Sequence, residues 1–250
     1  MIRILIVGDS FGEISSFNSI RFPDVGPGWP ELLAQHTNFQ VTNLCQGGSS
    51  LYFSYKNFKL HYKQHDKIIF CLTKPGRRYL PIPNYDDAFS QHHHNVESVN
   101  RLKLRFQYDP IASKYVEALE DYYTYLQDIE YDKYAQYTLV DHVQRLRPDT
   151  ILIPCFQDSF RTISGHPMEQ IGFNELKYLF NWKNFDHNIF NDFYKKGLTE
   201  ARKCHMCEEN NFIFYQDVLR WLDGDPVYIN VNKFVAPSKP VSHYWRKDQW

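Results

Sequence analysis

Residues 2–12 read Ile-Arg-Ile-Leu-Ile-Val-Gly-Asp-Ser-Phe-Gly, and this stretch decides the fold. Its first half is a short run of mostly apolar, β-branched residues that stops at Gly8. A run of this kind, bounded by a turn residue, is typical of a parallel strand that is buried on both faces. We therefore predict a strand over 2–8, with Asp9 and Ser10 just beyond its carboxyl end.

Three later segments repeat the pattern of a short apolar run followed by a loop. They cover residues 39–45, 67–72 and 150–155. Helical signals separate them, and strands that alternate with helices favour parallel βαβ units with right-handed crossovers. The sequence therefore predicts an α/β protein, a three-layer flavodoxin-like fold with a parallel sheet and long loop insertions.

The helices are predicted from periodicity and end signals. Pro30 stands where the first turn of a helix tolerates proline. Residues 112–146 carry apolar residues on one face and are expected to form two helices broken near Asp132, and a further helix is expected over 208–222, where Gly224 ends it.

Two segments lack such periodicity and are interpreted as insertions. They cover residues 78–110 and 156–185, and because each follows a strand, we expect both to lie over the carboxyl edge of the sheet and to shape a pocket there. No linker divides the chain clearly. We predict one α/β domain over 1–225 and a C-terminal extension over 226–250.

Charge and composition exclude several classes of function. The 28 basic and 29 acidic residues leave a net charge of −1, which predicts no general attraction to nucleic acid or to an anionic membrane. No apolar run approaches the roughly 18 residues of a membrane-spanning helix, and no signal-peptide pattern opens the chain. Five cysteines are too few for a secreted disulfide framework. We therefore expect a cytoplasmic protein.

Aromatic residues make up 17% of the chain. Two interpretations remain open. AT-rich coding DNA raises the frequency of Tyr and Phe without any function, whereas an aromatic binding surface for sugars or bases is the functional alternative.

Polar and small residues follow the first three predicted strands at the edge where ligands bind in open parallel sheets. Ser10 comes directly after the first strand, where a helix N-terminus would favour an oxyanion. Gly48 follows the second strand and offers a backbone N–H at close range. Thr73 and Arg77 follow the third. Taken singly, Ser10 also fits a helix cap and Gly48 a turn residue.

Taken together, these residues resemble the SGNH (GDSL-like) hydrolase family. Its first block is a Gly-Asp-Ser after the N-terminal strand, here Gly8-Asp9-Ser10, and its second block matches Asn43 and Gly48. The stretch 28–34 is similar to the first helix of the family. His205, just before the last predicted helix, matches the catalytic histidine, and its surroundings are similar to those in phage-encoded members.

Two positions depart from the family pattern. The third block of the family supplies an asparagine to the oxyanion hole, but the loop after the third strand has no Asn; Thr73 or Arg77 would have to donate instead. The acid of the family lies three residues before the histidine, where this chain has Arg202. Glu200 is the nearest carboxylate, so either Glu200 orients His205 or the pair works alone as a dyad.

The resemblance implies a serine hydrolase, an esterase or carbohydrate O-deacetylase, with Ser10 as nucleophile and His205 as base. The oxyanion hole would use the N–H groups of Ser10 and Gly48, with Thr73, and Arg77 would meet the substrate. The expected partner is a small-molecule or carbohydrate ester, with no cofactor. The alternative is a non-catalytic member of the same fold, a phage structural or carbohydrate-binding protein.

Other motifs are weaker. Cys204 and Cys207 form a single C-x-x-C with no second pair to complete a zinc site, and consecutive histidines at 92–94 rarely turn toward one ion, so we predict no metal. Lys74, Arg77 and Arg78 are either an anion-binding cluster or an ordinary charged loop. The chain has neither a P-loop nor a dinucleotide-binding glycine motif.

Overall fold

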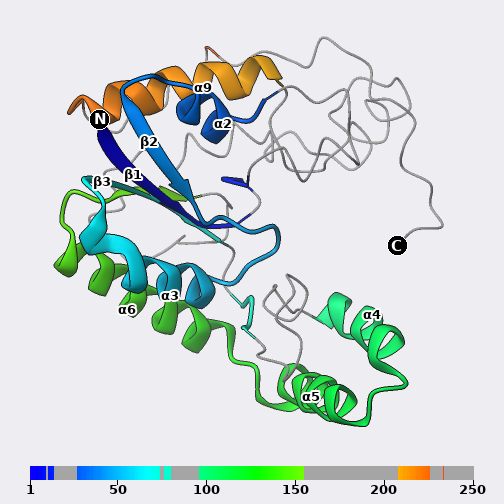
Figure 1. Cartoon of the computed structure of the whole chain (residues 1–250). Coiled ribbons are helices and arrows are strands. Elements are labelled where there is room, and N and C mark those ends of the chain that lie inside the picture. The colour runs from blue at the N-terminus through cyan, green and yellow to red at the C-terminus, as the bar shows by residue number, and fades with distance from the viewer. Residues whose placement is uncertain are drawn as a thin grey trace. The chain divides into compact units, whose positions relative to one another are not determined.

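The structure is a computed structural model of the chain, shown in Figure 1. It describes residues 1–9, 11–13, 27–73, 76–79, 96–154, 208–225 and 233. The chain divides into two compact units. The first comprises Met1–Ile2, Ile14–Val41 and Ile163–Trp250, and the second comprises Arg3–Glu13 and Thr42–Thr162.

The predicted α/β fold with a parallel sheet is confirmed. Four strands, β1 (Ile2–Val7), β2 (Phe39–Asn43), β3 (Lys67–Leu72) and β4 (Ile151–Pro154), form one sheet in the order β2-β1-β3-β4. β1 pairs with β3 in parallel, and β3 with β4. Just beyond β2, the N–H groups of Leu44 and Gln46 donate to the carbonyls of Ile6 and Gly8, so this segment runs in the same direction as β1.

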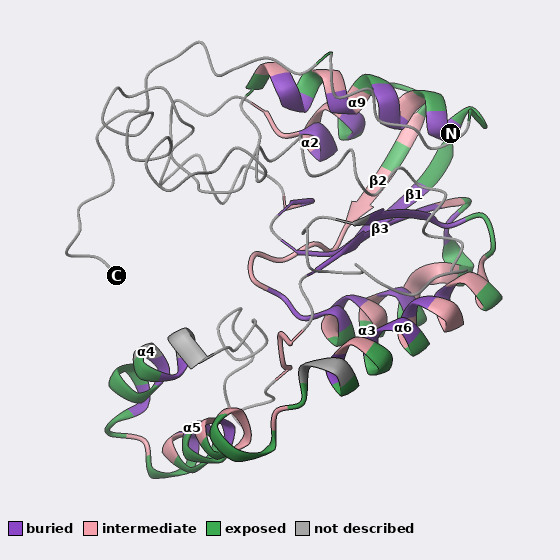
Figure 2. Cartoon of the chain, turned by 180° about the vertical axis from the view of Figure 1, so that it is seen from behind, coloured by how far each residue is buried: buried purple, intermediate pink, exposed green. Residues whose placement is uncertain are grey.

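The central strands β1 and β3 are buried from Ile4 and from Ile68 to their carboxyl ends, whereas Ile2 and Arg3 at the start of β1 are exposed. Ile4, Leu5, Ile6 and Val7 have no exposed surface, and Ile68 to Leu72 are almost as buried. Figure 2 shows these buried residues in purple along β1 and β3. This burial explains why both strands are continuous apolar runs rather than alternating ones.

Helix α3 (Leu51–His61) follows the turn after β2 and was not among the predicted helices. The Ser50 hydroxyl accepts a hydrogen bond from the Phe53 N–H and caps its first turn. Its buried residues Leu51, Ser54 and Phe58 recur at helical spacing, a signal that the sequence carried. It packs against α6 (Ile129–Leu146), and the Tyr55 hydroxyl lies 2.7 Å from His142 Nδ1 between them.

The segment 78–110 was predicted to be irregular throughout, but part of it is helical. Residues 96–106 form helix α4 (Val96–Phe106), which pairs with α5 (Pro110–Asp121) in a helical hairpin. The Asp109 carboxylate caps α5 by accepting the N–H groups of Ile111 and Ala112. The hairpin has its own apolar cluster, formed by Val99, Leu102, Phe106, Ala112, Val116 and Leu119. The spacing of these residues was the sequence signal for α4.

The break predicted near Asp132 lies a few residues earlier. A π-helical turn, η2 (Tyr122–Leu126), ends the hairpin, and α6 begins at Ile129. The Asp128 carboxylate accepts the Tyr131 N–H at the start of α6. Asp132 is inside the helix and buried, where it meets Arg78, so its role is tertiary rather than helix-breaking.

The first unit contains α2 (Trp29–Ala34) and α9 (Glu208–Leu222), both at predicted positions. The Trp29 N–H donates to Asn211 Oδ1, and the Trp29 ring meets Phe214 edge-on at 5.5 Å. Gly224, with a φ of 103°, follows α9 as expected for a helix stop. The predicted insertion over 156–185 and almost all of the extension over 226–250 lie outside the described residues.

The α4–α5 hairpin provides a matched pair of substitutions. Leu102 is 3% exposed, whereas Leu104, on the same helix, is 69% exposed. We expect Leu102→Ala to destabilise the hairpin by about 2–5 kcal/mol because it opens a cavity in the cluster. Leu104→Ala should change its stability by less than about 0.5 kcal/mol. Amide hydrogen exchange over 96–121 measures both; equal effects would contradict the described packing.

Candidate active site

The end of β1 approaches its neighbours more closely than a side chain would allow. A Cβ atom placed on Gly8 would lie 2.4 Å from Cys71 Cβ on β3. On the other side, the Gly8 carbonyl accepts hydrogen bonds from the Gln46 N–H and, at 2.9 Å, from the Ser49 hydroxyl. Glycine at this position therefore brings the ends of three strands together.

The turn after β2 is fixed against β1. Gly48 has a φ of 76°, a conformation that favours glycine, and the Ser49 N–H donates to the Gln46 carbonyl across the turn. Because the Ser49 hydroxyl is hydrogen-bonded to the Gly8 carbonyl, the preceding residue, Gly48, lies near the Gly8–Asp9 segment. The Glu13 carboxylate, which the sequence analysis did not single out, packs on the same turn: a Cβ on Gly47 would lie 2.7 Å from its Oε2.

Asn43 is hydrogen-bonded to the loop after β1. Its Nδ2 donates to the Gly12 carbonyl at 2.6 Å, and its Oδ1 accepts the Cys45 N–H at 2.9 Å. Of the second motif, Asn43 thus contacts Gly12 directly, and Gly48 precedes Ser49, whose hydroxyl donates to the Gly8 carbonyl.

Asp9 is the centre of a buried polar network. Its Oδ1 accepts the Phe11 N–H at 3.1 Å. Its Oδ2 accepts the Thr73 hydroxyl and Arg77 Nη1, both at 2.9 Å, and Arg77 Nη1 is 2.6 Å from Thr73 Oγ1. Asp9 has no exposed surface. Burial raises the pKa of the Asp9 carboxyl, while the Arg77 cation and the three hydrogen bonds oppose that rise.

Thr73 and Arg77, predicted for the oxyanion hole and for the substrate, are both engaged with Asp9. The Thr73 hydroxyl has one proton, and here it is donated to the carboxylate. The Arg77 side chain is only 13% exposed, and its Nη1 also lies 3.5 Å from the Ser49 carbonyl. In this arrangement both residues stabilise the loop after β1 through their hydrogen bonds to Asp9.

A second buried carboxylate holds the adjacent arginine. Arg78 Nη2 contacts both the Tyr122 hydroxyl and Asp132 Oδ1. The Tyr122 hydroxyl also donates to Asp132 Oδ1 at 3.0 Å, and the Gln127 amide lies 3.3 Å from Asp132 Oδ2.

The Tyr123 hydroxyl donates to the Gly76 carbonyl, and burial raises the Tyr123 pKa. Residues 76–79 are therefore held between the sheet and the base of the hairpin.

Two thiols lie beneath the same loop. A Cβ on Gly12 would lie 2.5 Å from Cys45 Sγ and 3.3 Å from Cys71 Sγ, and neither cysteine is part of a disulfide. Burial, together with a hydrogen bond to Cys71, raises the pKa of the Cys45 thiol well above its usual value. A raised pKa makes a thiol a poorer nucleophile at neutral pH, which disfavours Cys45 as a reactive cysteine.

Three predicted catalytic residues, Ser10, Glu200 and His205, lie outside the described residues and stay predictions. Lys74, the three histidines at 92–94 and the Cys204–Cys207 pair also lie outside the described residues. Within the ranges that the structure describes, no three side chains of the metal-binding types come together, and no helix is long and apolar enough to cross a membrane.

No model of a known protein family matches this sequence, and no curated protein matches it. Among solved structures, a catalytic mutant of an acetylxylan esterase from Geobacillus stearothermophilus is similar, with 15% identity and a TM-score of 0.36. That match covers 92% of this chain and 97% of the other. The function is therefore argued from the residues.

The Asp9–Arg77 pair predicts a pH-dependent loss of stability. Arg77→Met leaves a buried carboxylate uncompensated and should cost about 3–5 kcal/mol near neutral pH. Without the cation, the folded-state pKa of Asp9 rises further above its unfolded value. The loss in unfolding free energy should therefore be largest near pH 8, where Asp9 is charged, and should shrink as the pH falls toward about 4 and the buried carboxylate of the variant takes up a proton. Urea unfolding between pH 4 and 8 measures it.

Arg3→Met is the matched control, because Arg3 pairs with Asp66 at 2.8 Å on the exposed surface. Its effect should be small and reduced further by salt. An equal loss for both variants, or a loss for Arg77→Met that is the same at every pH, would contradict the buried pair.

Proposed function

We propose that this protein is a serine hydrolase of the SGNH type, which cleaves an ester or an acetyl group through Ser10. One observation carries the proposal: Gly48, at a φ of 76°, is tied through Ser49 to the carbonyl of Gly8, two residues before Ser10. The first and second motifs of the family are thereby adjacent at the carboxyl ends of the strands, where ligands bind in such sheets.

The adjacent backbone supports an oxyanion hole. The N–H groups of Ser10 and Gly48 are the proposed donors to the oxygen that becomes negative when the carbonyl is attacked. Each such donor is typically worth about 3 kcal/mol. The network around Asp9 supports this role because its hydrogen bonds hold Asp9 and the Phe11 N–H, on either side of position 10.

The proposed reaction is acyl transfer to water. His205 accepts the proton of the Ser10 hydroxyl as Ser10 Oγ attacks the ester carbon, and then donates it to the leaving alcohol oxygen. Water attacks the resulting acyl-serine with His205 again as base, and the acid is released. Glu200 is the proposed partner that orients the His205 ring. The substrate class is a small-molecule or carbohydrate ester.

The asparagine of the third block has no direct counterpart, since Thr73 donates its hydroxyl proton to Asp9. The loss of one oxyanion donor lowers the rate by about 10²–10³ without abolishing the reaction. The same observation favours the second candidate, a non-catalytic carbohydrate-binding or phage structural protein that keeps the fold.

Two measurements separate these candidates. A fluorophosphonate probe should label the protein at Ser10 and should not label Ser10→Ala, whereas Ser113→Ala, a change in α5, should be labelled like the unmodified protein. Labelling reports an activated serine without knowledge of the substrate. Failure to label the intact protein would favour the binding protein.

The catalytic pair also predicts a non-additive loss of activity. With p-nitrophenyl acetate, Ser10→Ala and His205→Ala should each abolish most of the activity, and the double variant should lose little more, since the two residues act as one unit. Full activity in Ser10→Ala would exclude Ser10 as the nucleophile.

A further inference from the structure

Three aromatic side chains gather at the start of α3. Tyr52 and Phe53 come from its first turn, and Tyr79 comes from the segment after Arg77. The Tyr52 and Tyr79 rings are 5.8 Å apart, and the Phe53 and Tyr79 rings are stacked at 6.5 Å. Tyr52 remains 48% exposed. We call Tyr52, Phe53 and Tyr79 the aromatic ledge.

The ledge is held in place. Lys56 Nζ donates to the Tyr79 hydroxyl at 3.1 Å and also lies 4.6 Å from the centre of its ring. Tyr52 stacks on Tyr55, whose hydroxyl is bonded to His142 of α6. A ring fixed in this way loses little side-chain freedom when a ligand covers it, which favours binding.

The ledge lies next to the candidate active site. Tyr79 is two residues from Arg77, so their Cα atoms are at most about 7 Å apart, and Tyr52 is at most about 14 Å from Gly48 along the chain. Arg77 reaches Asp9, the residue before Ser10, at 2.9 Å. A molecule that rests on the ledge is therefore within reach of that loop.

Charge indicates what kind of molecule fits. The two arginines before Tyr79 are each held by a buried carboxylate, Arg77 by Asp9 and Arg78 by Asp132. Their charges are thus balanced within the protein and are not arranged for a phosphate. The cation at the ledge is Lys56, whose Nζ donates to the Tyr79 hydroxyl and lies over the Tyr79 ring. An aromatic face beside such polar donors suits a ligand with one flat apolar face and hydroxyl groups around its edge.

We propose that the aromatic ledge is a subsite for a neutral sugar ring, which places an acetylated carbohydrate at the neighbouring site. This inference rests on the proposed function for the identity of the acyl group. The C–H face of a pyranose lies flat on the exposed Tyr52 ring, while its hydroxyl groups meet water and the polar ends of the ledge.

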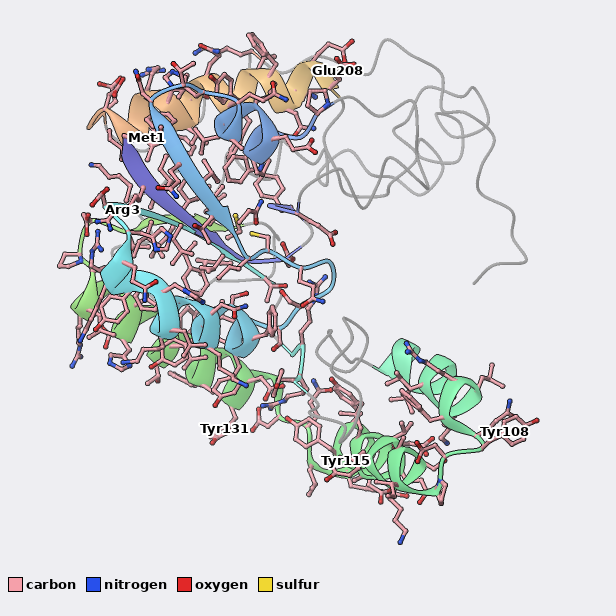
Figure 3. All side chains as sticks on the ribbon, in the orientation of Figure 1. Met1, Arg3, Tyr108, Tyr115, Tyr131 and Glu208 are labelled. Atoms are coloured by element: carbon pink, nitrogen blue, oxygen red, sulfur yellow. The ribbon has the colours of Figure 1, made fainter. Side chains whose placement is uncertain are left out.

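The test is equilibrium binding of unacetylated xylohexaose and cellohexaose to the full chain, by calorimetry or ligand-observed NMR. We expect at least one of them to bind and Tyr52→Ala to weaken that binding at least fivefold, with Tyr52→Phe retaining it. Tyr108→Ala is the control, because Tyr108 is 90% exposed on the hairpin and outside the ledge (Figure 3). Thermal unfolding verifies that Tyr52→Ala is folded.

The inference is overturned if neither hexasaccharide binds, if Tyr52→Ala binds as tightly as the unmodified protein, or if Tyr108→Ala weakens binding equally. Tyr52-dependent binding of adenosine monophosphate in place of the sugars would also overturn it. These sugars contain no ester, so binding is independent of hydrolysis. Binding through Tyr52 without labelling of Ser10 would refute the hydrolase and keep the ledge; labelling without such binding would do the reverse.

Discussion

The buried ion pair between Asp9 and Arg77 is the interaction on which the rest of the site depends. Asp9 sits at the end of β1 with no exposed surface, so its charge is tolerated only because Arg77, Thr73 and the Phe11 N–H surround it. The pair joins the loop after β1 to the loop after β3.

The same constraint reaches the helical hairpin. Arg78, next to Arg77, is held by Asp132 at the start of α6, and the Tyr123 hydroxyl donates to Gly76. Two successive arginines thus meet two buried carboxylates in different elements. Hydrogen bonds thereby connect the base of the helical hairpin to Gly76 and Arg78, on either side of Arg77. An insertion that only covered the surface would not need buried charges.

The strands were predictable because burial on both faces demands continuous apolar runs, and Ile4 to Val7 and Ile68 to Leu72 supply them. Helix α4 was missed because the segment 78–110 was interpreted as a whole. Its Val99, Leu102 and Phe106 have helical spacing, but they are buried only because α5 supplies the facing residues. The break before α6 was misplaced because Asp132 resembles a helix-ending residue until its partner Arg78 is known.

The sequence by itself determined the parallel α/β architecture, the order of the strands along the chain, and the small residues at the strand ends, since these follow from local periodicity and turn chemistry. It also placed Gly48 and Asn43 in one motif. Only the tertiary structure decided the partners of Thr73 and Arg77. Both were expected to face a substrate, yet both contact Asp9, because a buried carboxylate needs hydrogen-bond donors from the protein. These donors come from the segment after β3, 64 and 68 residues away in sequence.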